Sequence, residues 1–165
     1  MKTKIFIDGK EGTTGLQIVE RLENRSDLEI LLIDEDKRKD VNERKRLINE
    51  SDITFLCLPD AAAVEAVRLA ENPNVRIIDA STAHRTDPAW DYGFPELSAE
   101  HRENIAGSKR VANPGCYASG FISLVYPLVQ AGVFSGRIIR LTAHAVSGYS
   151  GGGKKIDRRN GGRGK

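Results

Sequence analysis

The chain has few of the residues that build disulfide frameworks or membrane spans. Among its 165 residues are two cysteines, one methionine and one tryptophan, and two cysteines can form at most one cross-link. Its apolar runs are short, such as ITFLCL at 53–58, whereas a membrane helix needs about 20 apolar residues. The opening, MKTKIFIDGKEG, lacks the long apolar stretch of a signal peptide. We therefore expect a cytoplasmic protein with reduced thiols, no membrane partner and no metal site.

Excess charge is also small, and it is unevenly distributed. The net charge is +2, from 25 basic and 23 acidic residues. The last twelve residues hold six of the basic and one of the acidic residues, which leaves 19 basic and 22 acidic residues in 1–153, a net charge of −3. A nucleic-acid-binding body carries its positive charge on a folded face, so we expect no nucleic-acid partner. An RNA-binding tail is an alternative, although no aromatic residue interleaves its charges.

What the sequence does have is a regular alternation of strand and helix signals over its first 80 residues. Short apolar or β-branched runs predict strands at 4–8, 28–34, 52–59 and 75–81. Helical spacing of apolar residues predicts helices at 14–25, 41–51 and 61–72. The run at 28–34 is apolar enough for a strand buried on both faces. This alternation is typical of an α/β fold with a Rossmann-like, doubly wound parallel sheet.

After residue 81 the pattern changes to a loop-rich segment, followed by fewer elements. We expect a short helix near 98–104, a short strand at 111–114, a helix over 118–132 and a one-sided strand over 136–146. The predicted organisation has three parts. These are an NAD(P)-binding domain (1–115), a helix with the incomplete start of a second, substrate domain (116–153), and a basic, glycine-rich, disordered tail (154–165).

The turn DGKEGTTG, residues 8–15, lies between the first strand and the first helix. Glycines there let the backbone approach a pyrophosphate, and the helix N-terminus supplies N–H groups and a partial positive charge. This strand-turn-helix position favours dinucleotide binding, while an ordinary glycine-rich turn is the alternative. The predicted cofactor contacts in the turn are Gly9, Gly12, Thr13, Thr14 and Gly15.

The segment DEDKRKD, residues 34–40, bears on the choice between NAD and NADP. Asp34 or Asp36 can hold the ribose of NAD at the end of the second strand. The basic run from Lys37 to Lys39 can instead meet the 2′-phosphate of NADP. A solvated charge run explains the same residues, so the sequence leaves these alternatives open.

The two cysteines lie in different contexts. Cys57 is inside the apolar run TFLCLP and is expected to fill the core. Cys116 follows Asn-Pro-Gly and precedes a predicted helix, whose N-terminus favours a thiolate, the nucleophilic form. Beside a nicotinamide, such a thiolate can take up an activated acyl group as a thioester for reduction to an aldehyde. The alternative is a chance cysteine at a helix start.

Four motifs in this order resemble the N-acetyl-γ-glutamyl-phosphate reductases, and most closely their shorter class. They are DGKEGTTG (8–15), YGFPEL (92–97), NPGCYAS (113–119) and AVSGYSGGGKK (145–155). The resemblance implies NADPH-dependent reduction of N-acetyl-glutamyl 5-phosphate, a small-molecule acyl phosphate, to its semialdehyde in arginine biosynthesis. It makes Cys116 the catalytic nucleophile and the glycine turn the NADP phosphate loop.

The same resemblance extends to residues outside the turn and the cysteine. It places Leu58 and Pro59 in the nucleotide pocket, and Ser147 and Gly148 in a loop near the nicotinamide and substrate. The substrate-binding residues that it implies are Ser81, Arg85 as an anion clamp, and Asn113 as an orienter of the acyl oxygen.

Members of this family are longer, form homo-oligomers, and carry their catalytic histidine beyond the position of Lys155. We therefore expect a truncated chain with little reductase activity. Of its own histidines, His84 is expected in a surface loop, His101 on a solvated helix face and His144 in a packing role. The alternatives are a non-catalytic NADP-binding remnant and an enzyme of the related aspartate-semialdehyde dehydrogenase type.

Overall fold

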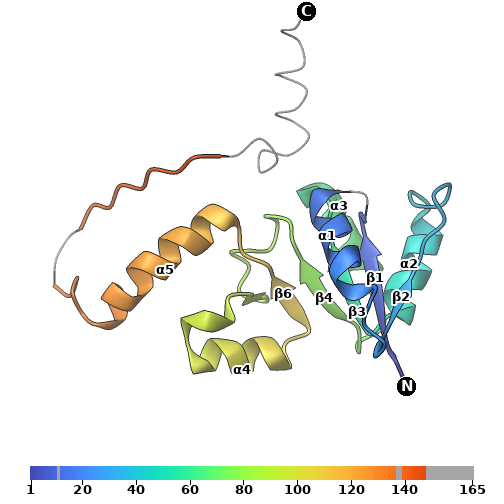
Figure 1. The fold of residues 1–165 in the computed structure, drawn as a ribbon, viewed down its shortest axis with the longest axis horizontal. Coiled ribbons are helices and arrows are strands. Elements are labelled where there is room, and N and C mark those ends of the chain that lie inside the picture. Colours follow the sequence, from blue (N-terminus) through green and yellow to red (C-terminus); the bar gives the residue numbers. More distant parts are fainter. Residues whose placement is uncertain (11, 137–138, 148–165) are drawn as a thin grey trace, which may run out of the picture. The chain divides into compact units, whose positions relative to one another are not determined.

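The computed structural model describes residues 1–10, 12–136 and 139–147 (Figure 1). The chain divides into two compact units, Met1–Ser119 and a second that begins at Gly120. Gly148 and the predicted tail at 154–165 lie outside the described residues, as does the side chain of Thr13.

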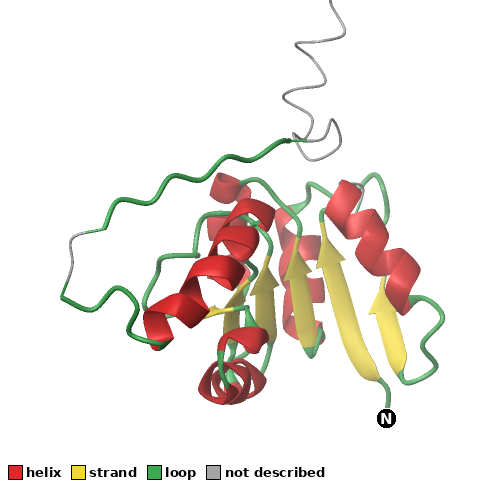
Figure 2. Cartoon of the chain, turned by 60° about the vertical axis from the view of Figure 1, so that its left-hand side comes forward, coloured by secondary structure: helices red, strands yellow, loops and turns green. Residues whose placement is uncertain are grey.

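The first unit is built on one parallel sheet in the order β2-β1-β3-β4-β6-β5, and the longer strands lie side by side in Figure 2. The strands are β1 (Thr3–Asp8), β2 (Leu28–Leu31), β3 (Ile53–Leu56), β4 (Arg76–Asp79), β5 (Asp91–Tyr92) and β6 (Arg110–Ala112). The helices of the chain are α1 (Thr13–Leu22), α2 (Val41–Glu50), α3 (Asp60–Leu69), η1 (Pro95–Leu97), α4 (Ala99–Gly107) and α5 (Cys116–Gln130). The predicted α/β parallel sheet is confirmed.

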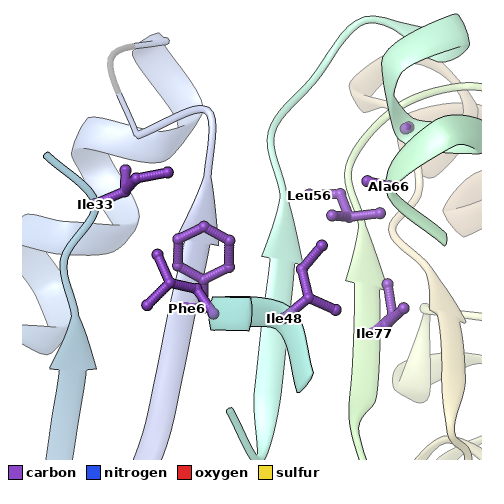
Figure 3. Close-up of a cluster of buried hydrophobic side chains, with 8 residues drawn as sticks. Phe6, Ile33, Ile48, Leu56, Ala66 and Ile77 are labelled. Atoms are coloured by element: carbon purple, nitrogen blue, oxygen red, sulfur yellow. The ribbon is translucent and has the colours of Figure 1, made fainter. Parts of the chain in front are cut away.

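The core lies between the central strands and the helices α2 and α3 (Figure 3). Phe6, Leu56 and Ile77 project from β1, β3 and β4, and each is fully buried. Ile48 of α2 and Ala66 of α3 cover them from the same face. The small alanine side chains of α3 let that helix approach the sheet closely, so this face excludes water.

The strand order creates a crevice beside β1. From β1 the chain first crosses to β2 on one side and then returns through α2 to β3 on the other. Right-handed crossovers therefore place α1 on one face of the sheet and α2 on the other. Where the winding reverses in this way, ligands bind in the crevice at the carboxyl ends of the strands. Here that crevice lies between the ends of β1 and β3.

The expectation that 28–34 is buried on both faces is wrong. The strand ends at Leu31, none of its residues is fully buried, and Leu32 is 67% exposed. The reason is its place at the sheet edge, where β1 is its only neighbour among the described strands. Its apolar composition alone does not distinguish an edge strand from a central one.

The strand predicted at 136–146 is also wrong over its described residues. Residues 139–146 form no strand, and the apolar Ile139 and Leu141 are exposed. A strand needs a neighbour to satisfy its backbone groups, and the described part of the second unit contains no strand to pair with it.

Candidate functional site

The glycine turn after β1 is shaped by close packing rather than by flexibility. Gly9 has φ +86°, and a Cβ there would overlap the carbonyl oxygen of Cys57 at the end of β3. A Cβ on Gly15 would come within 2.6 Å of the Gly9 oxygen. Both positions therefore require glycine. Gly12 precedes α1 as its N-cap and has only ordinary contacts around its Cβ position.

A cavity of about 390 Å³ opens beside this turn, within the size range of small-molecule sites. Its walls come from the ends of β1, β2 and β3, the loop before α2, and the first turns of α2 and α3. The lining residues are Asp8, Gly9, Lys10, Ile33, Glu35, Arg38, Lys39, Val41, Arg44, Leu58, Ala62 and Glu65. The tight turn and the crevice position fit the phosphate and nucleoside parts of a dinucleotide.

A buried ion pair closes the floor of this cavity. Arg44 Nε and Nη2 of α2 donate to Asp8 Oδ2 at 3.0 and 2.9 Å, and both side chains are under 10% exposed. Burial raises the pKa of Asp8 above its ordinary 3.8, although the hydrogen bond from Arg44 acts in the opposite direction. The sequence analysis did not identify Arg44 as a cavity residue, because the segment 41–51 has the composition of a solvated helix. The available signal was an acidic residue ending an apolar strand, which needs a partner.

The charged loop before α2 divides its side chains between the cavity and solvent. Arg38, Lys39 and Glu35 line the cavity. Lys37 instead pairs with Asp34 at 3.3 Å, with both side chains more than half exposed. Asp40 caps α2 by accepting from the backbone N–H groups of Asn42 and Glu43.

Cys116 is the first residue of α5 and is exposed, two residues earlier than the predicted start of that helix. It follows β6, whose carboxyl end points to the same sheet edge as that of β1 because all strands are parallel. Cys57 behaves differently. Burial raises the pKa of its thiol to about 11, and nearby Asp8 and Asp79 add to that effect. Cys57 is half-buried and is not among the core residues of the described chain, so the core-filling position expected for it is not seen.

The three residues predicted to bind substrate lie between β4 and Cys116. Arg85 donates from Nε to the Asn113 carbonyl oxygen at 3.0 Å and from Nη2 to the Ala80 carbonyl oxygen at 3.1 Å. Ser81 is buried and donates its hydroxyl to Asp79. Asn113 is exposed, and its side-chain amide donates to the Pro114 carbonyl oxygen at 3.3 Å. Their roles toward substrate stay predictions.

The remaining predicted cofactor contacts have varied positions. Leu58 lines the cavity and Pro59 is the exposed N-cap of α3. Thr14 is exposed in the first turn of α1, and Ser147 is exposed in the second unit. Gly148 lies outside the described residues.

The surface position predicted for His84 is wrong. Its side chain is 9% exposed, its Nδ1 lies 2.6 Å from Asp79 Oδ2, and its ring stacks on Trp90 with centroids 4.1 Å apart. The residues next to His84 carry no sign of this, because its partners Asp79 and Trp90 lie five and six residues away along the chain. His101 forms a hydrogen bond with Ser98 at the start of α4. His144 is exposed, so a packing role is not seen for it in the described residues.

No three histidine, cysteine, aspartate or glutamate side chains of the described residues come together as a metal site. No described helix combines the length and the apolarity that crossing a membrane requires.

The parallel sheet, the glycine turn and the crevice beside it define the class of an NAD(P)-binding α/β domain. The chain belongs to the semialdehyde dehydrogenase family. Residues 4–105 match the model of the semialdehyde dehydrogenase NAD binding domain, and residues 116–162 match that of the semialdehyde dehydrogenase dimerisation domain.

Curated relatives resemble the chain along nearly its whole length. N-acetyl-gamma-glutamyl-phosphate reductase 2 of Pseudomonas putida is 56% identical over 156 residues, which cover 94% of this chain and 50% of the relative. N-acetyl-gamma-glutamyl-phosphate reductase of Trichormus variabilis is 54% identical, with 94% and 48% covered. The chain thus spans about half the length of the curated relatives it matches.

Solved structures support the fold. Aspartate semialdehyde dehydrogenase II of Vibrio cholerae, complexed with ASA, superposes with a TM-score of 0.58 at 15% identity, covering 79% of this chain and 43% of that one. The Candida albicans aspartate semialdehyde dehydrogenase, solved with NADP, has a TM-score of 0.57 at 15% identity, with 79% and 48% covered. At this identity the likeness concerns architecture alone.

Proposed function

We propose that this chain is the nucleotide-binding, nucleophile-bearing part of an NADPH-dependent reductase of N-acetyl-glutamyl 5-phosphate. The observation that carries the proposal is the exposed Cys116 at the start of α5, on the same sheet edge as the glycine turn. The names of the relatives at 56% and 54% identity supply the substrate class.

In the proposed reaction the Cys116 sulfur attacks the acyl carbon of the substrate. A C–S bond forms, the C–O bond to phosphate breaks, and inorganic phosphate leaves with the electron pair. The first turn of α5 presents unpaired backbone N–H groups toward the developing negative charge. NADPH, when bound, would supply the hydride that reduces the resulting thioester to the aldehyde, with the C–S bond breaking to release the Cys116 thiolate.

We further propose NADP rather than NAD as the cofactor. Arg38 and Lys39 line the cavity, whereas Asp34, a candidate for holding the NAD ribose, pairs with Lys37. A charged hydrogen bond contributes about 1.5–3 kcal/mol, so Arg38→Ala with Lys39→Ala is expected to weaken NADP binding at least about tenfold. Binding of NAD, measured by the same calorimetric titration, should change little. Equal loss for both nucleotides would contradict the assignment.

The test of the proposed chemistry is formation of the acyl-enzyme. Incubation with N-acetyl-glutamyl 5-phosphate should release phosphate and add the acyl group to Cys116, seen by peptide mass spectrometry. The Cys116→Ser variant should form no thioester. Aspartyl phosphate should acylate Cys116 more slowly than the N-acetylated substrate does. Absence of acylation in the intact chain would refute the proposal. That result, with nucleotide binding retained, would favour the non-catalytic remnant.

Steady-state turnover of this chain is expected to be low. General acid–base catalysis typically raises a reaction rate about 10²–10⁴-fold. The family resemblance places the histidine that would act as acid and base at a position beyond Lys155. NADPH oxidation by this chain should therefore be at least about 100-fold slower than that by a full-length relative. Homo-oligomers, a cytoplasmic location and the domain boundaries at 115 and 153 stay predictions.

A further inference from the structure

The end of β4 carries a buried carboxylate that the proposed chemistry does not use. Asp79 ends β4 with its side chain completely buried. Its Oδ1 accepts from the Ser81 backbone N–H at 2.9 Å, and its Oδ2 accepts from the Ser81 hydroxyl at 2.7 Å. The third donor is His84, whose Nδ1 lies 2.6 Å from the same Oδ2. Because a buried carboxylate without donors is costly, these partners fix the start of the loop.

His84 is held on two sides. Asp79 accepts from its Nδ1, and the Trp90 ring stacks on it with an interplanar angle of 14°. Trp90 itself packs against the hydrophobic core. Two backbone hydrogen bonds, from Asp87 N–H to the His84 oxygen and from Trp90 N–H to the Asp87 oxygen, close the loop between them. The imidazole therefore connects the end of β4 to the core.

The next residue, Arg85, contacts the turn before the nucleophile. Its Nε donates to the Asn113 carbonyl oxygen and its Nη2 to the Ala80 carbonyl oxygen. A Cβ on Gly115 would lie 2.7 Å from Arg85 Nη1, so the guanidinium rests against the backbone one residue before Cys116. A guanidinium with two fixed donors is held in orientation as well as position.

We propose that His84 is a positioning residue, which holds Arg85 against the 113–115 turn and thereby sets the reactivity of Cys116. This role deepens the proposed function and rests on Cys116 being its nucleophile. All the residues involved lie in the first unit, Met1–Ser119. The Arg85 cation beside the turn favours the approach of anionic species at the sulfur.

The test compares the alkylation rate of Cys116 by iodoacetate, an anionic reagent, in the intact 165-residue chain and in two variants. His84→Phe keeps a stacking ring but removes the donor to Asp79, while Arg85→Gln removes the cation and leaves the cluster. Both should slow alkylation of Cys116 about threefold or more, as expected for losing one nearby charge. His84→Asn keeps a donor near the Nδ1 position and should restore most of the rate.

Two internal reporters separate positioning from loss of folding. Trp90 is the only tryptophan, so its emission should change in His84→Phe and stay unchanged in Arg85→Gln. Cys57 is half-buried with a pKa raised to about 11, and its slow labelling should stay unchanged in any variant that keeps its fold. If Cys57 becomes exposed in His84→Phe, that variant has lost its fold, and the alkylation rates of Arg85→Gln and His84→Asn then test the proposal.

An unchanged alkylation rate of Cys116 in Arg85→Gln would overturn the proposal. So would an alkylation rate in His84→Asn that is as slow as the rate in His84→Phe. The role of His84 and the proposed function can fail separately. A chain whose Cys116 responds to these variants but is never acylated by N-acetyl-glutamyl 5-phosphate retains the positioning role and loses the proposed chemistry.

Discussion

At the scale of single residues, the two cysteines show how position controls a thiol. Cys57 follows β3 among apolar neighbours and two carboxylates, all of which disfavour a thiolate. Cys116 lies exposed at a helix start. Both cysteines follow parallel strands and lie at the same edge of the sheet, yet one is half-buried and the other is an exposed candidate nucleophile.

Alkylation should distinguish the two thiols. At pH 8, Cys116 is expected to be labelled at least about 100-fold faster than Cys57, because the pKa of about 11 at Cys57 leaves few thiolates there. The Cys57 rate should rise about tenfold for each pH unit between 8 and 10. Peptide mapping by mass spectrometry measures both sites at once. Comparable rates at pH 8 would show that Cys57 is accessible.

The glycine turn can be tested with a matched pair of substitutions. Gly9→Ala places a Cβ against the Cys57 carbonyl oxygen at a positive φ, and it should lower the free energy of unfolding by about 1–3 kcal/mol. Gly12→Ser is the control, because its Cβ meets nothing closer than 3.5 Å and serine is a favourable N-cap. Urea unfolding measures both. A tolerated Gly9→Ala would mean that the turn can relax.

At the scale of elements, the Asp8–Arg44 pair joins β1 to α2 under the cavity. Arg44 Nη1 also lies 3.8 Å from Glu65 of α3. One side chain therefore ties together the strand that leads into the glycine turn and the two helices that wall the cavity. A buried pair of this kind fixes geometry more than it adds stability.

Breaking the pair should be costly. Arg44→Met leaves a buried carboxylate unpaired and should lower the free energy of unfolding by about 3–5 kcal/mol. Adding Asp8→Asn should recover part of this loss, because no buried charge then remains at the site. Arg46→Met is the control on the same helix. Its partners Glu43 and Glu50 are near the surface, so its cost should stay below about 1 kcal/mol. Equal losses of unfolding free energy in Arg44→Met and Arg46→Met would show that the buried pair matters no more than a surface pair.

The raised pKa of Asp8 predicts a specific pH dependence. Because the folded state holds this proton more tightly than the unfolded state, stability falls as pH rises from 3.8 through the folded-state pKa. Asp8→Asn should remove that component of the slope. Urea midpoints measured between pH 4 and 7 for both proteins provide the comparison. Parallel pH profiles would show that Asp8 ionises equally in the two states.

At the scale of the whole molecule, α5 carries apolar side chains that the described chain leaves uncovered. Phe121, Leu124, Leu128 and Val129 are between 39% and 75% exposed. Residues 116–162 match a dimerisation domain, and large exposed apolar patches mark interaction surfaces. The second unit is therefore expected to take part in association.

Sedimentation analysis should show concentration-dependent self-association of the chain. Leu124→Lys with Leu128→Lys adds charge to the apolar surface and should keep the protein monomeric, since burying unpaired charge is unfavourable. Gln130→Lys, an exposed polar position on the same helix, should leave association unchanged. Association that persists in the double variant would place the contact elsewhere.

The sequence by itself determined the fold class, the glycine turn and the cysteine at a helix start, because these depend on local periodicity and on glycine's backbone freedom. Only the tertiary structure decided which apolar strand lies at the sheet edge, that Arg44 closes the cavity floor, and that His84 is buried between Asp79 and Trp90. The first two outcomes depend on which distant residues the crossovers bring together, and the third on how the chain folds back between β4 and β5, and local periodicity carries no information about either.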